Sequence, residues 1–195
     1  MGDAVMVVRT AINRIFGRSF APAPPVDVVP SEADDAVQEF ARKYAMPIDL
    51  LRAIVHTESA GNPWALRYEP GYRWLWDVRE SRPYKGDPHR LPAPSFVSGD
   101  TELIGQKTSW GLMQVMGAVA REHGFRGRYL SVLCDPEYGL EYGCRHLRHL
   151  HERFGAQGWE AVAAAFNAGS PRRREDGAWI NQAYIDRIRH YGGLA

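Results

Sequence analysis

Apolar residues recur at helical spacing in two successive segments that follow residue 30. The first segment opens on Ser31 and Asp34, which have the spacing of a capping box. The apolar residues after this pair mark one face of a helix: Val37, Phe40, Ala41 and Tyr44. A second helix is predicted to begin at Pro47, which suits a first helical turn. Its stripe at i, i+3, i+4 and i+7 consists of Leu51, Ile54, Val55 and Glu58.

The next part of the chain, residues 61–109, has no sustained helical period and is rich in Pro, Gly and aromatic residues. This pattern predicts an irregular or partly β segment, and it is long for a simple connection. Helical signals return from Ser109. The apolar positions that carry them are Leu112, Val115, Met116, Val119 and Ala120.

Three further helices are predicted in the last third of the chain. Asp135 caps a helix that begins at Pro136 and runs to Phe154, and Gly155 closes it. The other two cover residues 159–168, closed by a glycine, and residues 181–191. The fold class is therefore mainly α (α+β), with at most a small sheet.

Residues 1–30 are predicted to form an N-terminal amphipathic segment and a Pro-rich linker ahead of one domain at residues 31–195. Apolar residues at helical spacing mark the segment: Val5, Val8, Ile12 and Ile15. Such a helix can lie on a membrane surface, pack against the domain or fray. Charged residues interrupt the apolar stretch, so neither a signal-peptide core nor a membrane span is expected.

Charge and cysteine content remove several classes of function. The net charge of the 195 residues is +1, so no global field gathers nucleic acid or acidic membranes. Cys134 and Cys144 are too few for a disulfide framework and lack partners at metal-ligand spacing. We expect two free thiols in the core, no metal and no cofactor.

Glu58 is the first candidate for chemistry, because it stands on the core-facing stripe of its helix. A desolvated carboxylic acid holds its proton to higher pH and can act as a general acid near neutrality. A glutamate at a helix end also commonly forms a cap or a salt bridge. Glu58 alone therefore does not decide the function.

Three segments and a tyrosine change this view. They are His56–Pro63 (HTESAGNP), Ser109–Met116 (SWGLMQVM), Ala164–Gly169 (AAFNAG) and Tyr184 in the last predicted helix. Their order and residues resemble the soluble lytic transglycosylases, relatives of goose-type lysozyme that cleave the glycan strands of peptidoglycan. The resemblance covers roughly residues 31–191. It implies a lysozyme-like fold with a two-lobed substrate groove.

The resemblance implies one catalytic acid/base, Glu58, and a set of residues around it. Ser59 would fix the turn after Glu58, and Tyr184 would place its hydroxyl near the carboxyl. The residues expected to line the sugar site are Met113, Gln114, Phe166 and Asn167. Phe166 stands where the family usually has tyrosine, so any role of that hydroxyl is in doubt. The amides of Gln114 and Asn167 have an alternative role, which is to satisfy buried backbone groups.

A long insertion separates Glu58 from Gln114, which are 56 positions apart. It carries many aromatic residues and arginines, and aromatic faces stack on sugar rings. We expect the segment Tyr68–Lys107 to lie over or beside the groove, with Trp74 and Trp76 as substrate contacts. Alternatively, the same rings form a small core of the insertion itself.

The expected function is cleavage of the MurNAc-β-1,4-GlcNAc bond with formation of 1,6-anhydro ends, by a monomer that needs no cofactor. A hydrolytic muramidase is an alternative, because the insertion offers further carboxylates: Glu69, Asp77, Glu80, Asp87, Asp100 and Glu102. A non-cleaving wall-binding or assembly component is another. Without an expected signal peptide, action at the cell wall or in the periplasm fits phage lysis, a virion or a secretion machine.

Overall fold

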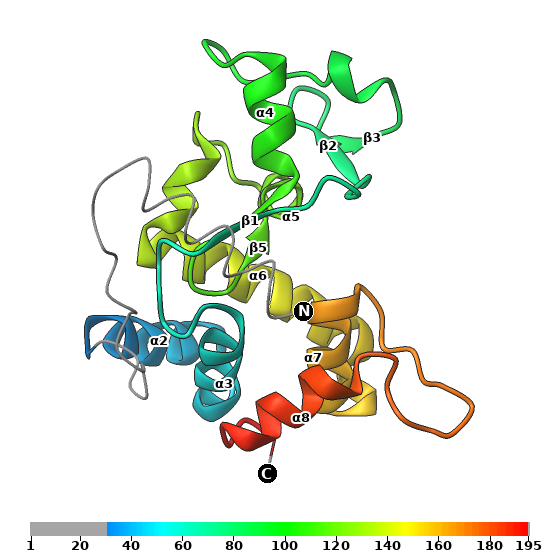
Figure 1. Ribbon diagram of the computed structural model, residues 1–195. Coiled ribbons are helices and arrows are strands. Elements are labelled where there is room, and N and C mark those ends of the chain that lie inside the picture. The colour runs from blue at the N-terminus through cyan, green and yellow to red at the C-terminus, as the bar shows by residue number, and fades with distance from the viewer. Residues whose placement is uncertain (1–30, 195) are drawn as a thin grey trace, which may run out of the picture.

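The computed structural model describes residues 31–194, and the predicted N-terminal helix and Pro-rich linker lie outside this range. Seven α-helices occur within it (Figure 1). They are α2 (Ser31–Tyr44), α3 (Ile48–Ser59), α4 (Gly99–Gln106), α5 (Gly117–Glu122), α6 (Pro136–Phe154), α7 (Trp159–Ala168) and α8 (Gln182–His190). Helices α2, α6, α7 and α8 confirm the sequence predictions to within about a turn.

The strands are short and form two small antiparallel sheets in the described part of the chain. One sheet has the order β1-β4-β5, and the other is the hairpin β2-β3. The strands are β1 (Leu66–Tyr68), β2 (Leu75–Asp77), β3 (Arg82–Tyr84), β4 (Thr108–Trp110) and β5 (Val115–Met116). Three short 3₁₀ helices complete the elements: η1 (Pro88–Arg90), η2 (Leu130–Cys134) and η3 (Gly155–Gln157).

The elements form two groups joined by the long helix α6. Figure 1 shows the strands with α4 and α5 at one end, and α2, α3, α7 and α8 at the other. Helix α6 contacts α2, α5 and α7, and α3 contacts α8. The buried face of α6 includes Leu140, Leu147 and Leu150. This arrangement confirms the mainly α, lysozyme-like fold.

Helix α3 shows how the sequence pattern sets the packing. Its predicted apolar stripe is buried, with Leu51, Ile54 and Val55 having no exposed surface. The helix ends because Ala60 turns into the left-handed region, at a φ of 52°. Burial of this stripe fixes the direction in which the last turn of the helix points.

The segment 61–109 contains a helix that the sequence analysis missed. Helix α4 has only eight residues, and a glycine lies near each end, so its apolar period is too weak to detect. Ser98 caps it by accepting a hydrogen bond from the backbone N–H of Thr101 at 3.1 Å. Leu103 and Gln106 on its inner face are buried.

The helix expected from Ser109 begins only at Gly117, so the first part of that prediction is wrong. Residues 108–116 instead form β4, a tight loop and β5. Gly111 and Gln114 have φ values of 69° and 46°, which no helix accommodates. Leu112 and Val115 are buried because the loop passes through the core, and this burial imitates a helical period.

Asp34 forms hydrogen bonds with side chains of the first two helices. Its carboxylate accepts hydrogen bonds from Arg52 at 2.7 and 2.9 Å and from Gln38 at 2.9 Å. The arginine holds the pKa of Asp34 below its usual value. Asp34 therefore ties α2 to α3.

The insertion has a small core of its own, but this core consists mainly of leucines and not of the aromatic rings that the alternative prediction proposed. Leu75, Leu91 and Leu103 are buried together, and Tyr84 packs against them. The two cysteines are free and buried, as expected. No helix among residues 31–194 combines the length and apolar character needed to cross a membrane.

A buried ion pair joins α4 to α5. Arg121 donates to both oxygens of Glu102 at 2.8 Å, and each side chain is only 1% exposed. Arg121 also donates to the backbone carbonyls of Phe125 and Gly127. The guanidinium thus gathers three segments around one buried charge.

We expect Glu102→Gln to lower the free energy of unfolding by about 3 kcal/mol, because it leaves the Arg121 charge buried without a counter-ion. Urea unfolding followed by circular dichroism measures this change. Asp100→Asn removes an exposed acid from the same helix and is the matched control. A loss below about 1 kcal/mol for Glu102→Gln would show that the pair is not a structural anchor.

Candidate active site

Glu58 lies in the last turn of α3, at the end of the buried stripe. Its side chain is half-buried, and burial raises the pKa of the carboxyl above its ordinary value of 4.5. The carbonyl end of a helix also disfavours a negative charge. Glu58 is therefore suited to hold a proton and release it within the site.

Tyr184 approaches Glu58 from the first turn of α8. Its hydroxyl is buried and has no partner at ordinary hydrogen-bond geometry among the described residues. It is nevertheless close enough to the carboxyl for each group to act on the other. Burial and the nearby Glu58 raise the pKa of Tyr184, and the hydroxyl of Tyr184 in turn lowers the pKa of Glu58. The predicted proximity of these two groups is thus present in the structure.

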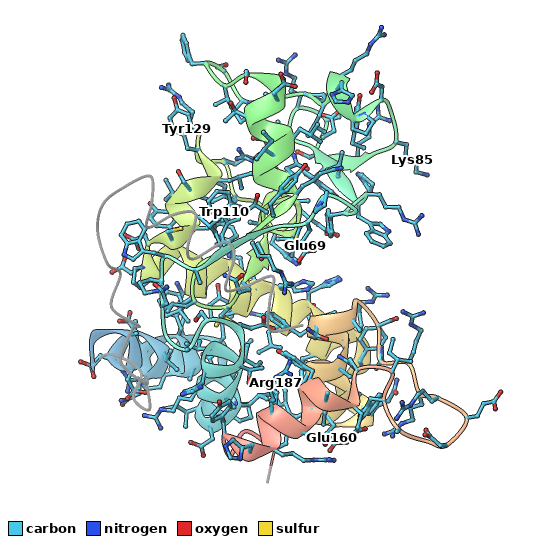
Figure 2. The ribbon with its side chains drawn as sticks, in the orientation of Figure 1. Glu69, Lys85, Trp110, Tyr129, Glu160 and Arg187 are labelled. Atoms are coloured by element: carbon cyan, nitrogen blue, oxygen red, sulfur yellow. The ribbon has the colours of Figure 1, made fainter. Side chains whose placement is uncertain are left out.

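Two arginines also act on Glu58 and come from opposite groups of elements. Arg67 belongs to β1 and Arg187 to α8, and both positive charges lower the pKa of Glu58. Arg67 forms an ion pair with Glu69, with the nitrogen and oxygen 2.5 Å apart. Figure 2 shows Glu69 on the side of the small sheets and Arg187 on α8. Burial therefore raises the pKa of Glu58, whereas these two cations lower it.

Ser59 connects the end of α3 to the loop between β4 and β5. Its hydroxyl lies 2.8 Å from the carbonyl oxygen of Leu112 and 3.0 Å from that of Val55, and it donates to either. The loop reaches Ser59 because Gly111 adopts a positive φ. A side chain at Gly111 would collide with the backbone of Leu133.

Gln114 holds this loop together from within. Its amide nitrogen donates to the carbonyls of Ala65 and Gly111, at 2.9 and 3.0 Å, and its oxygen accepts from Ser109 at 2.9 Å. These contacts match the alternative role of an amide that satisfies backbone groups. Met113, expected to touch sugar, has no exposed surface and packs against Gly143 of α6.

Asn167 lies exposed at the end of α7 and is held by a residue that the sequence analysis missed. The amide nitrogen of Asn181 donates to the Asn167 oxygen at 2.9 Å and to the carbonyl of Ala164 at 3.1 Å. The amide nitrogen of Asn167 bonds to no described residue. Asn181 had no sequence signal beyond its place just before the last helix.

Phe166 is half-buried and packs on His146, with ring centroids 5.5 Å apart. His146 in turn hydrogen-bonds His123 at 3.0 Å. Burial lowers the pKa of His146 to about 3 and that of His123 to about 4, so both rings are neutral near pH 7. Phe166, at the position where the family that the sequence resembles usually has tyrosine, thus faces an aromatic, uncharged surface.

Buried polar atoms without partners gather on the elements that carry the site. Among the described residues, such atoms occur on His56, Thr57, Asn181 and Tyr184, and on Trp76 in the insertion. The first four lie near the end of α3 and the start of α8. Buried polar groups are normally satisfied, so a group of exceptions is typical of a ligand site.

The two tryptophans expected to bind substrate have different surroundings. Trp74 is 65% exposed, with its ring at 5.6 Å from that of Tyr72 and the Arg73 guanidinium at 5.1 Å. Trp76 is half-buried, and the amide of Gln106 bonds both its backbone N–H and its carbonyl at 2.8 Å. Trp74 has the free face that a sugar platform needs.

Two carboxylates of the insertion have structural roles. Asp77 is buried and accepts from two backbone N–H groups of the next turn at 2.9 and 3.1 Å, and Glu102 pairs with Arg121. Glu69 differs, because its partner Arg67 lies close enough to Glu58 to lower its pKa. No three His, Cys, Asp or Glu side chains in residues 31–194 gather to hold a metal ion.

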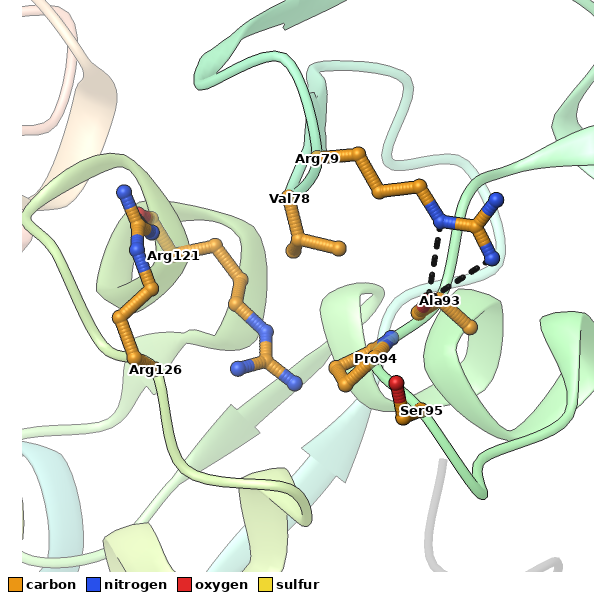
Figure 3. Close-up of a pocket in the computed structure, with 7 residues that line it drawn as sticks. All are labelled: Val78, Arg79, Ala93, Pro94, Ser95, Arg121 and Arg126. Carbon is orange, nitrogen blue, oxygen red and sulfur yellow. Dashed lines mark hydrogen bonds between the residues drawn. The ribbon is translucent and has the colours of Figure 1, made fainter.

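A surface pocket of about 270 Å³ lies elsewhere on the molecule (Figure 3). It is lined by Val78, Arg79, Ala93, Pro94, Ser95, Arg121 and Arg126. None of the residues expected to act on substrate lines it. This pocket is therefore separate from the site at Glu58. The hydrogen bonds of Arg121, which lines it, are already directed to Glu102 and to backbone carbonyls.

We expect a carbon-13 NMR titration of Glu58 to show a midpoint above 4.5, since burial favours the neutral acid. Tyr184→Phe should raise the midpoint further, because the hydroxyl that favours the carboxylate is lost. Tyr191→Phe, which alters an exposed tyrosine packed on His56, is the control. An unchanged or lower midpoint in Tyr184→Phe would contradict this geometry.

Comparison with known proteins gives one finding. The family model described as the transglycosylase SLT domain matches residues 93–191, more than half of the chain. The match includes Gln114, Asn167 and Tyr184, and it begins downstream of Glu58. No curated protein and no solved structure matches the chain. The chain belongs to the transglycosylase SLT domain family.

Proposed function

We propose that this protein is a lytic transglycosylase that cleaves the MurNAc-β-1,4-GlcNAc bond of peptidoglycan and leaves 1,6-anhydro-MurNAc ends. Family membership supports transglycosylase activity on peptidoglycan in general. The observation that carries the finer proposal is the setting of Glu58. Glu58 is half-buried, burial raises the pKa of its carboxyl, and the side chains that shift this pKa are a tyrosine and two arginines, with no second carboxylate among them.

In the first step, the protonated Glu58 gives its proton to the glycosidic oxygen, and the bond from that oxygen to C1 of MurNAc breaks. The acetamido oxygen of the same sugar stabilises the positive charge that develops at C1. A raised pKa keeps Glu58 protonated for this step. The hydroxyl of Tyr184 and the charge of Arg187 then stabilise the carboxylate that forms.

In the second step, the Glu58 carboxylate takes the proton of the C6 hydroxyl, and O6 attacks C1. The new bond closes the 1,6-anhydro ring, and Glu58 is protonated again. No water enters the product. One carboxyl that alternates between acid and base is sufficient, whereas ordinary glycosidases need two carboxylates about 5 to 9 Å apart.

The remaining site residues divide into those that hold the site and those that meet the sugar. Ser59 and Gln114 fix the loop beside Glu58. Asn167 has a free amide nitrogen and is oriented by Asn181, which suits it to bind the acetamido carbonyl. Trp74 offers an exposed ring for stacking on a more distant sugar. The proposed cleavage of peptidoglycan takes place at the cell wall.

We expect digestion of purified glycan strands to release products with 1,6-anhydro ends, because the step above excludes water. Mass spectrometry of the released muropeptides distinguishes them from hydrolytic products, which are one water heavier.

Glu58→Gln keeps the size of the side chain and cannot transfer a proton, so it should lose about 10²- to 10⁴-fold in rate.

Hydrolytic products would instead identify a muramidase, and Glu69 is the carboxylate to test first because of its link through Arg67. If the protein is a muramidase that uses Glu69, Glu69→Gln abolishes activity. If it is a lytic transglycosylase, the same variant retains most of its activity. Absence of any release by a folded wild-type protein would leave wall binding as the function.

We expect Trp74→Ala to raise KM about three- to tenfold with little change in kcat, since an exposed stacking ring contributes to binding alone. Trp76→Ala should instead lower the free energy of unfolding by about 2 kcal/mol, because its ring is half-buried. Phe96→Ala removes an 86% exposed ring of the same insertion and is the control. Unchanged KM in Trp74→Ala would show that the insertion does not bind substrate through this ring.

A further inference from the structure

Arg187 is an exposed cation beside the catalytic carboxyl that has no counter-ion in the described part of the chain. It lies one turn after Tyr184 on α8, with its guanidinium 6.0 Å from the centroid of the Tyr184 ring. Its charge lowers the pKa of Glu58, so Arg187 acts on this carboxyl through space. None of the described side chains or carbonyls forms a hydrogen bond or ion pair with it.

Other arginines near the site are satisfied. Arg67 pairs with Glu69, two positions away at the end of β1, and Arg52 pairs with Asp34. On α8 itself, Arg189 pairs with Glu160 and with Asp186. Arg187 thus differs from its neighbour two positions away, although both stand in the same helical turn and both favour the helix C-terminus.

We propose that Arg187 binds a carboxylate carried by the lactyl or peptide substituent of the muramic acid at the cleaved bond. This inference rests on the proposed function and names the charged part of the substrate that the site recognises. The lactyl group is attached to O3 of the same ring whose C1 reacts. The reacting C1 and this carboxylate thus belong to the same substituted sugar, and a cation near Glu58 is a suitable partner for it.

Guanidinium chemistry suits this role. An arginine offers five N–H donors in a planar fork that matches a carboxylate, and such charge-assisted bonds are stronger than neutral ones. The ring of Tyr184 limits the conformations of the Arg187 side chain by packing beside it. The guanidinium thus lies next to the ring whose hydroxyl acts on Glu58.

Three forms of the glycan strand test the proposal. Strands stripped of peptide carry a free lactyl carboxylate, and the same strands treated with carbodiimide and methylamine carry a neutral amide there. Strands with intact stem peptides carry carboxylates only on the peptide. Binding of each form is measured by titration in the Glu58→Gln background, and KM and kcat are measured with active Glu58.

We expect the protein with Arg187 to bind stripped strands about tenfold more tightly than amidated strands at pH 7. Arg187→Gln should remove this preference by weakening the binding of stripped strands to about the level of amidated strands. If intact strands show the same dependence on Arg187, the peptide supplies the carboxylate, and if they do not, the lactyl group supplies it. Both results support binding of a carboxylate.

Arg189→Gln is the matched control, because it removes the same charge from the same turn and should leave the preference intact. An equal loss of affinity for stripped and amidated strands in Arg187→Gln would overturn the proposal. So would an unchanged affinity for both, with only a shift in the pH profile of kcat. Because the titration needs no turnover, failure of the protein to cleave would refute the proposed function without deciding the role of Arg187.

Discussion

The site depends on how the last turn of α3 is anchored to the loop between β4 and β5. The Ser59 hydroxyl meets the carbonyl of Leu112, and Gln114 ties the same loop to the backbone of Ala65. These bonds join the helix that carries Glu58 to the small sheet that carries Arg67. The backbone pays for this in unusual conformations at Gly111 and Gln114. The loop must be rigid because a general acid acts only when its proton is correctly directed.

Two opposing effects set the state of Glu58. Burial raises the pKa of the carboxyl, whereas Tyr184, Arg67 and Arg187 lower it. A carboxyl under burial alone would hold its proton too firmly to serve as a base in the second step. Under the cations alone it would be ionised and unable to serve as an acid in the first. The balance suits the proposed mechanism, in which one group does both in turn.

The long amphipathic elements could be predicted from the sequence, because burial of a wide apolar stripe leaves a clear period. Helices α3, α6 and α7 are examples. Helix α4 could not, because eight residues with two glycines hold too few apolar positions. The loop at Gly111–Gln114 was mistaken for a helix because its buried residues fall at helical intervals. Only the positive φ values, which depend on tertiary contacts, separate the two structures.

The candidate site shows the same division between local and tertiary information. Glu58 could be found because a carboxylate on an apolar stripe is locally anomalous, and Tyr184 could be found through its motif. Arg187 carries no such anomaly, since arginines in the last turn of a helix are common. Its significance comes from the absence of a partner within residues 31–194 and from its effect on Glu58, 129 positions away in sequence. In the proposed role, specificity for a charged substrate depends on such a tertiary neighbour, which the motif around Glu58 does not contain.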